Sequence, residues 1–218
     1  DLVLQEICLD ILYTFMVKSP VLEDKMKRKV NVFFHLLRLL SEHPEVHNIQ
    51  ARTMRLLVRL VDSDQTRAQI SHLKHWRHLL DSVMSAIKHF YQDAELLCNS
   101  LMIVTLILKG NSDLQTYMAE KYIHRIMLLF KSASQHPDAG KLLFCVLWQT
   151  AHSEQARPLM ALPIVNLVLE HLTQWHADSS IICDCFCLLE KLCLYDKFSD
   201  ILVDKDVVMR SLLPEMMS

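Results

Sequence analysis

The chain has 218 residues, of which 51% are hydrophobic, and its formal net charge is −2 at pH 7. It contains only two glycines. Because tight hairpins and phosphate-binding loops need glycine at positive φ, this composition argues against a β-rich fold and against a nucleotide-binding loop. We therefore predict an all-α fold, and the balanced charge disfavours nucleic acid as a partner.

Proline, glycine and short polar clusters divide the chain into a series of predicted helices. Ser19-Pro20 and His43-Pro44 should each end a helix, Gly110 suits a left-handed helix end, and Pro163 suits the first position of a helix. We expect one helix, then four triplets and a final pair, at about 2–17, 22–27, 28–42, 46–61, 65–73, 76–91, 94–109, 114–120, 122–134, 141–151, 153–160, 163–175, 179–194, 197–202 and 207–217.

The last helix of each triplet carries a recurring pattern of small and apolar residues. It is clearest in IQARTMRLLVRL from Ile49, in LLCNSLMIVTLI from Leu96 and in ICDCFCLLEKLC near the end of the chain, and LQEICLDILYTF from Leu4 follows it as well. A weaker copy begins near residue 141. A spacing of about 40 to 47 residues is the period of two- or three-helix solenoid repeats.

This triplet resembles the armadillo repeat and, less closely, the HEAT repeat. The resemblance implies a right-handed α-solenoid of three-helix repeats in a single domain, 1–218, with repeats at about 1–17 (partial), 19–61, 63–109, 111–151, 153–194 and 195–218 (partial). It is carried by the ladders Ala51/Thr53/Met54/Leu57/Leu60, Cys98/Ser100/Leu101/Val104/Ile107 and Cys183/Cys185/Phe186/Leu189/Leu192. Because solenoids need polar caps and neither end of the chain carries one, we expect a segment of a larger protein.

In the armadillo family the third helices line a concave groove that binds extended peptides through Trp and Asn ladders. Neither ladder is present here: the Trp-type positions hold Asp10, Arg55, Met102, Leu147 and Cys187, and the Asn-type positions hold Thr14, Arg59, Leu106, Ala151 and Lys191. We therefore do not expect the peptide backbone to be clamped as in those members.

Three arginines, Arg52, Arg55 and Arg59, lie instead on one stripe of the helix 46–61 and should face solvent, because Met54, Leu57 and Leu60 form its apolar stripe. Guanidinium groups bind carboxylates in pairs, and Met and Trp supply adaptable contact area. We predict a groove for an acidic, amphipathic segment of a protein partner. Its candidate residues are Arg52, Arg55, Arg59, Asn99, Met102, Leu106, Trp148 and Lys191.

Two other interpretations stay open. The arginines could simply solvate their helix, and the segment could be architectural, packing on other parts of its own chain or self-associating through its exposed end repeats. Binding of a metal by His72, His75 and His78 or by Cys183, Cys185 and Cys187 is disfavoured, since no further ligand stands at the required spacing and the cysteines occupy packing positions.

No motif for catalysis is found, since the sequence has neither a glycine-framed nucleophile nor HExxH. We expect no enzyme activity, cofactor, metal or small-molecule substrate. Seven cysteines, an odd number, indicate a reducing compartment, so we expect an intracellular protein of cytoplasm or nucleus. No apolar run is long enough to span a membrane.

Overall fold

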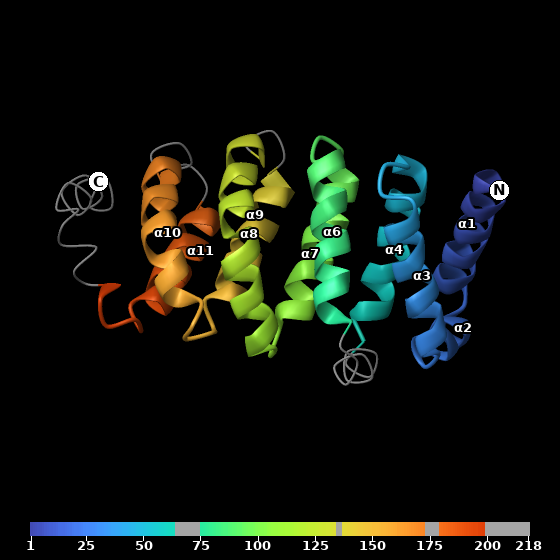
Figure 1. The fold of residues 1–218 in the computed structure, drawn as a ribbon, viewed down its shortest axis with the longest axis horizontal. Helices are drawn as coiled ribbons and strands as arrows, with labels where there is room; N and C mark the ends of the chain where they lie inside the picture. The colour runs from blue at the N-terminus through green and yellow to red at the C-terminus, as the bar shows by residue number, and fades with distance from the viewer. Residues whose placement is uncertain (64–74, 134–136, 173–178, 199–218) are drawn as a thin grey trace. The chain divides into compact units, whose positions relative to one another are not determined.

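The computed structural model describes residues 1–63, 75–133, 137–172 and 179–198, and within these ranges the regular structure consists of ten α-helices (Figure 1). The helices form two compact units, Asp1–Lys109 and Gly110–Ser218. The boundary lies at Gly110, between two of the expected repeats. The expected helices at 65–73 and 207–217, and all but the first residues of that at 197–202, lie outside the described residues.

Unit 1 contains six described helices. They are α1 (Leu2–Lys18), α2 (Pro20–Lys27), α3 (Val30–Glu42), α4 (His47–Val61), α6 (Trp76–Phe90) and α7 (Ala94–Leu108). Their bounds agree with the predicted ones to within about two residues because caps and breakers mark most ends. Ser19 caps α2 through its hydroxyl, with Pro20 at the first helical position, and Gly110 follows α7 with φ of 72°.

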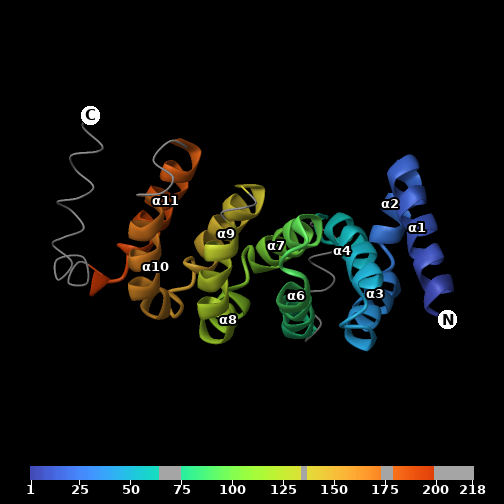
Figure 2. The ribbon, with the colours of Figure 1, turned by 90° about the horizontal axis from the view of Figure 1, so that it is seen from above.

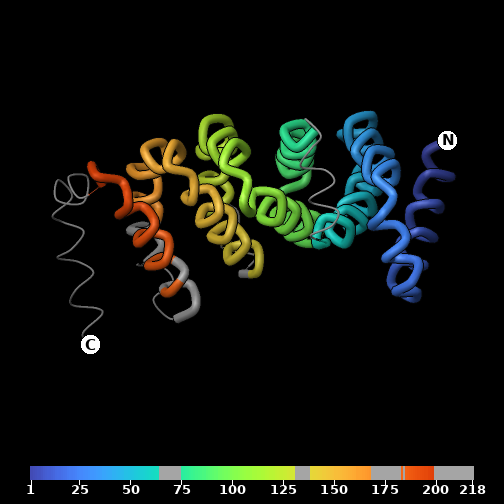
Figure 3. Tube along the Cα trace, turned by 90° about the horizontal axis from the view of Figure 1, so that it is seen from below, coloured from blue at the N-terminus to red at the C-terminus, as the bar shows by residue number. Residues whose placement is uncertain are grey.

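Five of the six described helices of unit 1 are arranged in two rows, and α2 packs on α1 and α3 (Figure 2). The helix α4 packs between α1 and α7, so these three form one row, and α3 packs on α6 in the second row. Each row is tied to the other by the hairpins α3–α4 and α6–α7, which Figure 3 traces along the chain. The core between the rows is built from side chains that are almost fully buried: Phe33, Leu37, Leu40, Met54, Leu57, Leu79, Val83, Leu101 and Val104.

Asp93 caps the start of α7 and joins this helix to α4. Its carboxylate accepts hydrogen bonds from Leu96 N–H at 2.9 Å and from the His47 ring at 2.6 Å. Burial alone would raise the pKa of Asp93, but the hydrogen bonds from the Leu96 amide and from His47 outweigh it, and the pKa is lowered below its ordinary value of 3.8. Because folding lowers the pKa of Asp93, its ionised carboxylate stabilises the folded chain at pH values above 3.8. This stabilisation is lost as the pH falls below 3.8 and through the lowered pKa.

Asp93→Asn should therefore cost up to about 1 kcal/mol at pH 7, since Asn keeps the cap but removes the charge. The difference between the two proteins should shrink as the pH falls from 4 towards 2, where the wild-type carboxylate also becomes protonated. Urea unfolding at several pH values measures this. A difference that stays constant between pH 7 and the lowest value tested would show that the ionised carboxylate contributes no stability.

Unit 2 contains α8 (Ser112–Ala133), α9 (Pro137–Thr150), α10 (Arg157–Leu172) and α11 (Ser179–Leu192). It is built from the hairpins α8–α9 and α10–α11, in which α8 packs on α10 and α9 on α11. Two predicted breaks are wrong. The segments 114–120 and 122–134 form one helix, because Leu114, Met118, Tyr122 and Ile126 continue a single buried stripe through residue 121.

The second wrong break is at Pro163, which lies inside α10 rather than at its start. A proline inside a helix leaves the carbonyl of the residue four positions earlier without a donor, and that residue is the exposed Leu159, which water can reach. Buried residues on both sides of Pro163 hold the helix together: Met160, Ala161, Ile164 and Val165. The described part of unit 2 therefore consists of helix pairs where triplets were expected.

Candidate functional site

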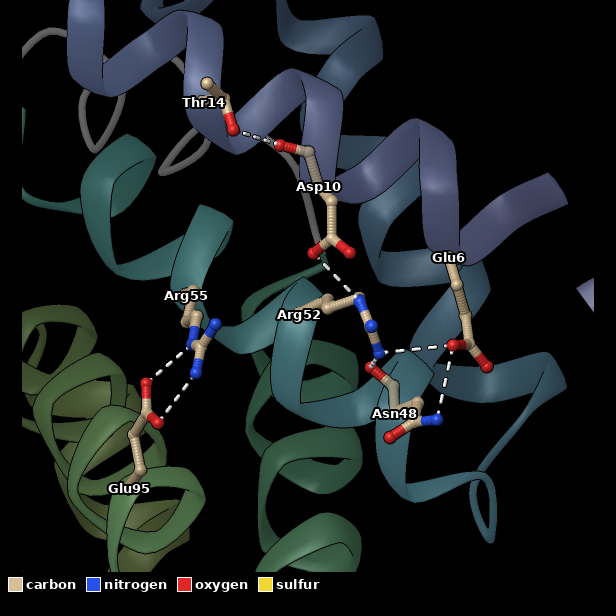
Figure 4. Close-up of polar contacts among 7 residues, drawn as sticks. All are labelled: Glu6, Asp10, Thr14, Asn48, Arg52, Arg55 and Glu95. Carbon is tan, nitrogen blue, oxygen red and sulfur yellow. Dashed lines mark hydrogen bonds and ion pairs between the residues drawn. The ribbon is translucent and has the colours of Figure 1, made fainter. Parts of the chain in front are cut away.

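The three predicted arginines lie half-exposed on α4, and each of them is paired with a carboxylate from another helix of unit 1. Arg52 donates from Nε to Asp10 of α1 at 2.9 Å, and its Nη1 lies 3.2 Å from Glu6 of the same helix (Figure 4). Asn48 also donates to Glu6, at 3.2 Å. The first turns of α4 are thus tied to α1.

Arg55 is directed towards α7, away from α1, and makes a bidentate pair with Glu95 (Figure 4). Its Nε and Nη2 donate to the two oxygens of Glu95, on α7, at 2.5 and 2.7 Å. These bonds raise the pKa of the Arg55 guanidinium above its ordinary value. Such a bidentate contact fixes the direction of both side chains as well as their distance.

Arg59 reaches Glu23 of α2 at 2.9 Å, and Glu23 also pairs with Lys27 at 3.0 Å. Burial alone would raise the pKa of Glu23, but the hydrogen bonds from Arg59 and Lys27 outweigh it and the net effect is a lowered pKa. Arg59 therefore links α4 to α2 through this ion pair. We use the term ion-pair row for the other five residues: Glu6, Asp10, Arg52, Arg55 and Glu95.

The arginine stripe was predicted from the sequence, but its partners were not. The paired carboxylates lie 42, 40 and 36 residues from Arg52, Arg55 and Arg59 respectively. These separations are close to one repeat. A search for acidic residues about one repeat away from each arginine could therefore have found them, because neighbouring repeats bring such positions side by side.

Three further candidates lie on α7. Asn99, Met102 and Leu106 follow Glu95 at four, seven and eleven residues, so they share its side of the helix. Met102 is 40% exposed, whereas Asn99 and Leu106 are half-buried. The packing of α4 on α7 thus places a short, partly apolar surface next to the Arg55–Glu95 pair.

The last two candidates belong to unit 2. Trp148 lies half-exposed on α9, with its ring 4.3 Å from that of His152, and Lys191 lies half-exposed on α11. The helices α9 and α11 pack on each other. The ion-pair row is therefore a feature of unit 1 alone, and Trp148 and Lys191 are a separate pair of candidates.

The residues considered for metal binding are dispersed where the structure describes them. His75 packs edge-on against Phe34, and the ring of His78 lies 3.3 Å from the Ser41 hydroxyl, while His72 is outside the described residues. Cys185 is buried, whereas Cys183 and Cys187 are exposed. In the described ranges, no three His, Cys, Asp or Glu side chains are grouped so that they could hold a metal ion.

Among the same residues, no helix is both long and apolar enough to cross a membrane. Comparison of the chain with family models, with curated proteins and with solved structures finds no match.

Proposed function

We propose that this chain is a non-catalytic protein–protein interaction scaffold of the armadillo type, a right-handed solenoid within the cell, and that its ion-pair row binds an acidic, amphipathic segment of another protein. The observation that carries this proposal is the Arg55–Glu95 pair, which is solvent-accessible and shares its side of α7 with the exposed Met102, about two turns further along the helix. A charged fork next to an adaptable apolar side chain suits a ligand that has a carboxylate and an apolar residue on one face.

In this proposal the Glu95 carboxylate occupies the position on Arg55 that a carboxylate of the partner would take. It occupies the Nε and Nη2 side of Arg55, while Nη1 donates no hydrogen bond to any described residue. Exposed ion pairs contribute only about 0.2–1 kcal/mol, so a carboxylate of the partner can share or replace Glu95 at small cost. The affinity then comes chiefly from apolar contact with Met102 and Leu106.

The charge of the row limits which ligands fit. Three carboxylates face two guanidinium groups in it. A uniformly acidic peptide would be repelled by Glu6 and Asp10, whereas a segment with one or two carboxylates beside apolar residues can meet Arg55 and Met102 together. We therefore expect an amphipathic helix in preference to an acidic tail.

Capture of proteins from a cell extract, with the bound proteins quantified by mass spectrometry, tests the proposal. Arg55→Ala should deplete a set of captured proteins several-fold, and Glu95→Gln should enrich the same set, because it removes the competing carboxylate. Arg38→Ala is the matched control, since Arg38 is an exposed arginine of α3 that pairs only loosely with Glu42, at 3.6 Å.

The proposal requires that Arg55→Ala lowers and Glu95→Gln raises the amount of the same captured proteins. Equal capture by wild type and Arg55→Ala would overturn it, provided that both proteins melt at the same temperature within a few degrees. Loss of the same proteins from both variants would show that the ion pair matters only for the packing of α4 on α7.

A further inference from the structure

The ion-pair row leaves one acceptor and one donor open to solvent. Asp10 uses its Oδ1 to accept from Arg52 at 2.9 Å, and among the described residues its Oδ2 accepts no hydrogen bond. The Asp10 side chain is 53% exposed. Within the same ranges Nη1 of Arg55 is also open, and the Arg55 side chain is 38% exposed. The row therefore offers an incoming ligand one negative and one positive position.

The negative position carries charge that the row does not compensate. Two carboxylates, Glu6 and Asp10, share the single guanidinium of Arg52, so one negative charge is left over at this end of the row. The Glu6 side chain is only 22% exposed and also accepts a hydrogen bond from Asn48. Asp10 therefore presents most of the uncompensated charge to solvent.

The two open positions are separated by about the spacing of two helices. Asp10 meets Arg52 between α1 and α4, whereas Arg55 is directed away from α1, towards Glu95 of α7 (Figure 4). Packed helices lie about 8–10 Å apart. Because an α-helix rises about 1.5 Å per residue, two side chains of one ligand helix that reach both positions lie about seven residues apart, or two turns.

We propose that the segment bound at the row is an amphipathic helix that carries a lysine or arginine as well as its carboxylate, about two turns apart on one face. Its cationic side chain binds Asp10, and its carboxylate binds Arg55. The inference rests on the function proposed above and adds the second charge of the ligand.

The spacing of two turns keeps both charges of the ligand available. In a free helix, opposite charges three or four residues apart pair with each other. At about seven residues they are about 10 Å apart and cannot do so. A purely acidic helix would instead bring a carboxylate next to Asp10, and a purely basic one would bring a cation next to Arg55. The row thus disfavours both by like-charge repulsion.

Selection from a phage-displayed library of helical peptides, with the complete 218-residue chain as bait, tests the inference. The enriched peptides should carry Asp or Glu, as the proposed function requires, together with Lys or Arg about seven residues away. With Asp10→Asn as bait, the acidic residue should stay enriched and the basic one should not. Asp24→Asn is the matched control, because Asp24 is a similarly exposed aspartate, 57%, that pairs with Arg28 outside the row.

Binding of one enriched peptide, measured by fluorescence anisotropy, tests the contact itself. Asp10→Asn in the chain, and alanine at the basic position of the peptide, should each weaken binding by about three- to tenfold. Both changes together should weaken it no more than either one, because they remove the same ion pair. The melting temperature of Asp10→Asn should match that of the wild type, since Glu6 still holds Arg52.

The outcomes separate this inference from the proposed function. Enriched peptides with an acidic residue but no basic one would overturn the inference alone, as would two changes whose effects multiply. A selection that enriches no acidic peptide would overturn the proposed function and the inference with it. The same holds for peptides that bind Arg55→Ala as tightly as the wild type.

Discussion

Leu56→Ala is expected to lower the free energy of unfolding of unit 1 by about 2–5 kcal/mol, because it removes a fully buried side chain from the face of α4 that packs on α1. The neighbouring helices are held by their own contacts and can close the cavity only in part. Hydrogen exchange followed by mass spectrometry measures the loss within residues 1–109, separately from unit 2.

Ile11→Ala is the matched control for this prediction. Ile11 holds the position of α1 that Leu56 holds in α4, but it is 48% exposed. We expect a change within about 0.5 kcal/mol, as for other surface substitutions. A similar loss in both variants would contradict the assignment of α1 as the open edge of unit 1.

Gln50→Leu is expected to cost about 2–3 kcal/mol, although it replaces a buried polar side chain with an apolar one of similar size. Gln50 Nε2 donates to the carbonyls of Leu40 and His43, both at 2.9 Å. The Leu40 carbonyl would otherwise pair with the amide of residue 44, but residue 44 is proline and has no N–H. Gln50 therefore supplies the donor that Pro44 lacks.

Gln5→Leu is the control that separates the loss of these hydrogen bonds from the replacement of a polar side chain by an apolar one. Gln5 is the equivalent residue of α1, yet its side chain makes no hydrogen bond among the described residues, and its Oε1 is buried without a partner. Replacing it should be neutral or slightly stabilising, since no acceptor is left unpaired. Urea unfolding of both variants measures the difference. Equal costs at the two positions would show that the bonds from Gln50 contribute little.

The sequence alone predicted the helical fold and most helix ends, because these depend on local chemistry. The residues that stop or cap helices, such as Ser19-Pro20, Pro44 and Gly110, act within a few residues of their own position. The two errors, at residue 121 and at Pro163, have the opposite cause. There a buried stripe continues through the expected break, and packing outweighs the local signal.

Local pattern also identified which faces of the repeated helices are apolar, but not what covers them. Leu4, Ile11 and Phe15 of α1 have the same pattern as Ile49, Leu56 and Leu60 of α4, and only the tertiary structure shows that the first set is exposed and the second buried. The reason is that burial depends on the neighbour beside a helix, and the neighbour is not encoded in the periodicity of the helix itself.

The same difference between what local pattern predicts and what tertiary packing decides is seen for the arginines of the candidate site. Their spacing placed Arg52, Arg55 and Arg59 on one stripe of α4 that should face solvent, and in the structure all three side chains are half-exposed. That Asp10, Glu95 and Glu23 pair with them depends on how the fold brings α1, α7 and α2 within reach of α4, across separations of 36 to 42 residues. Helical periodicity acts over a few turns, whereas these pairs form only where separate helices meet.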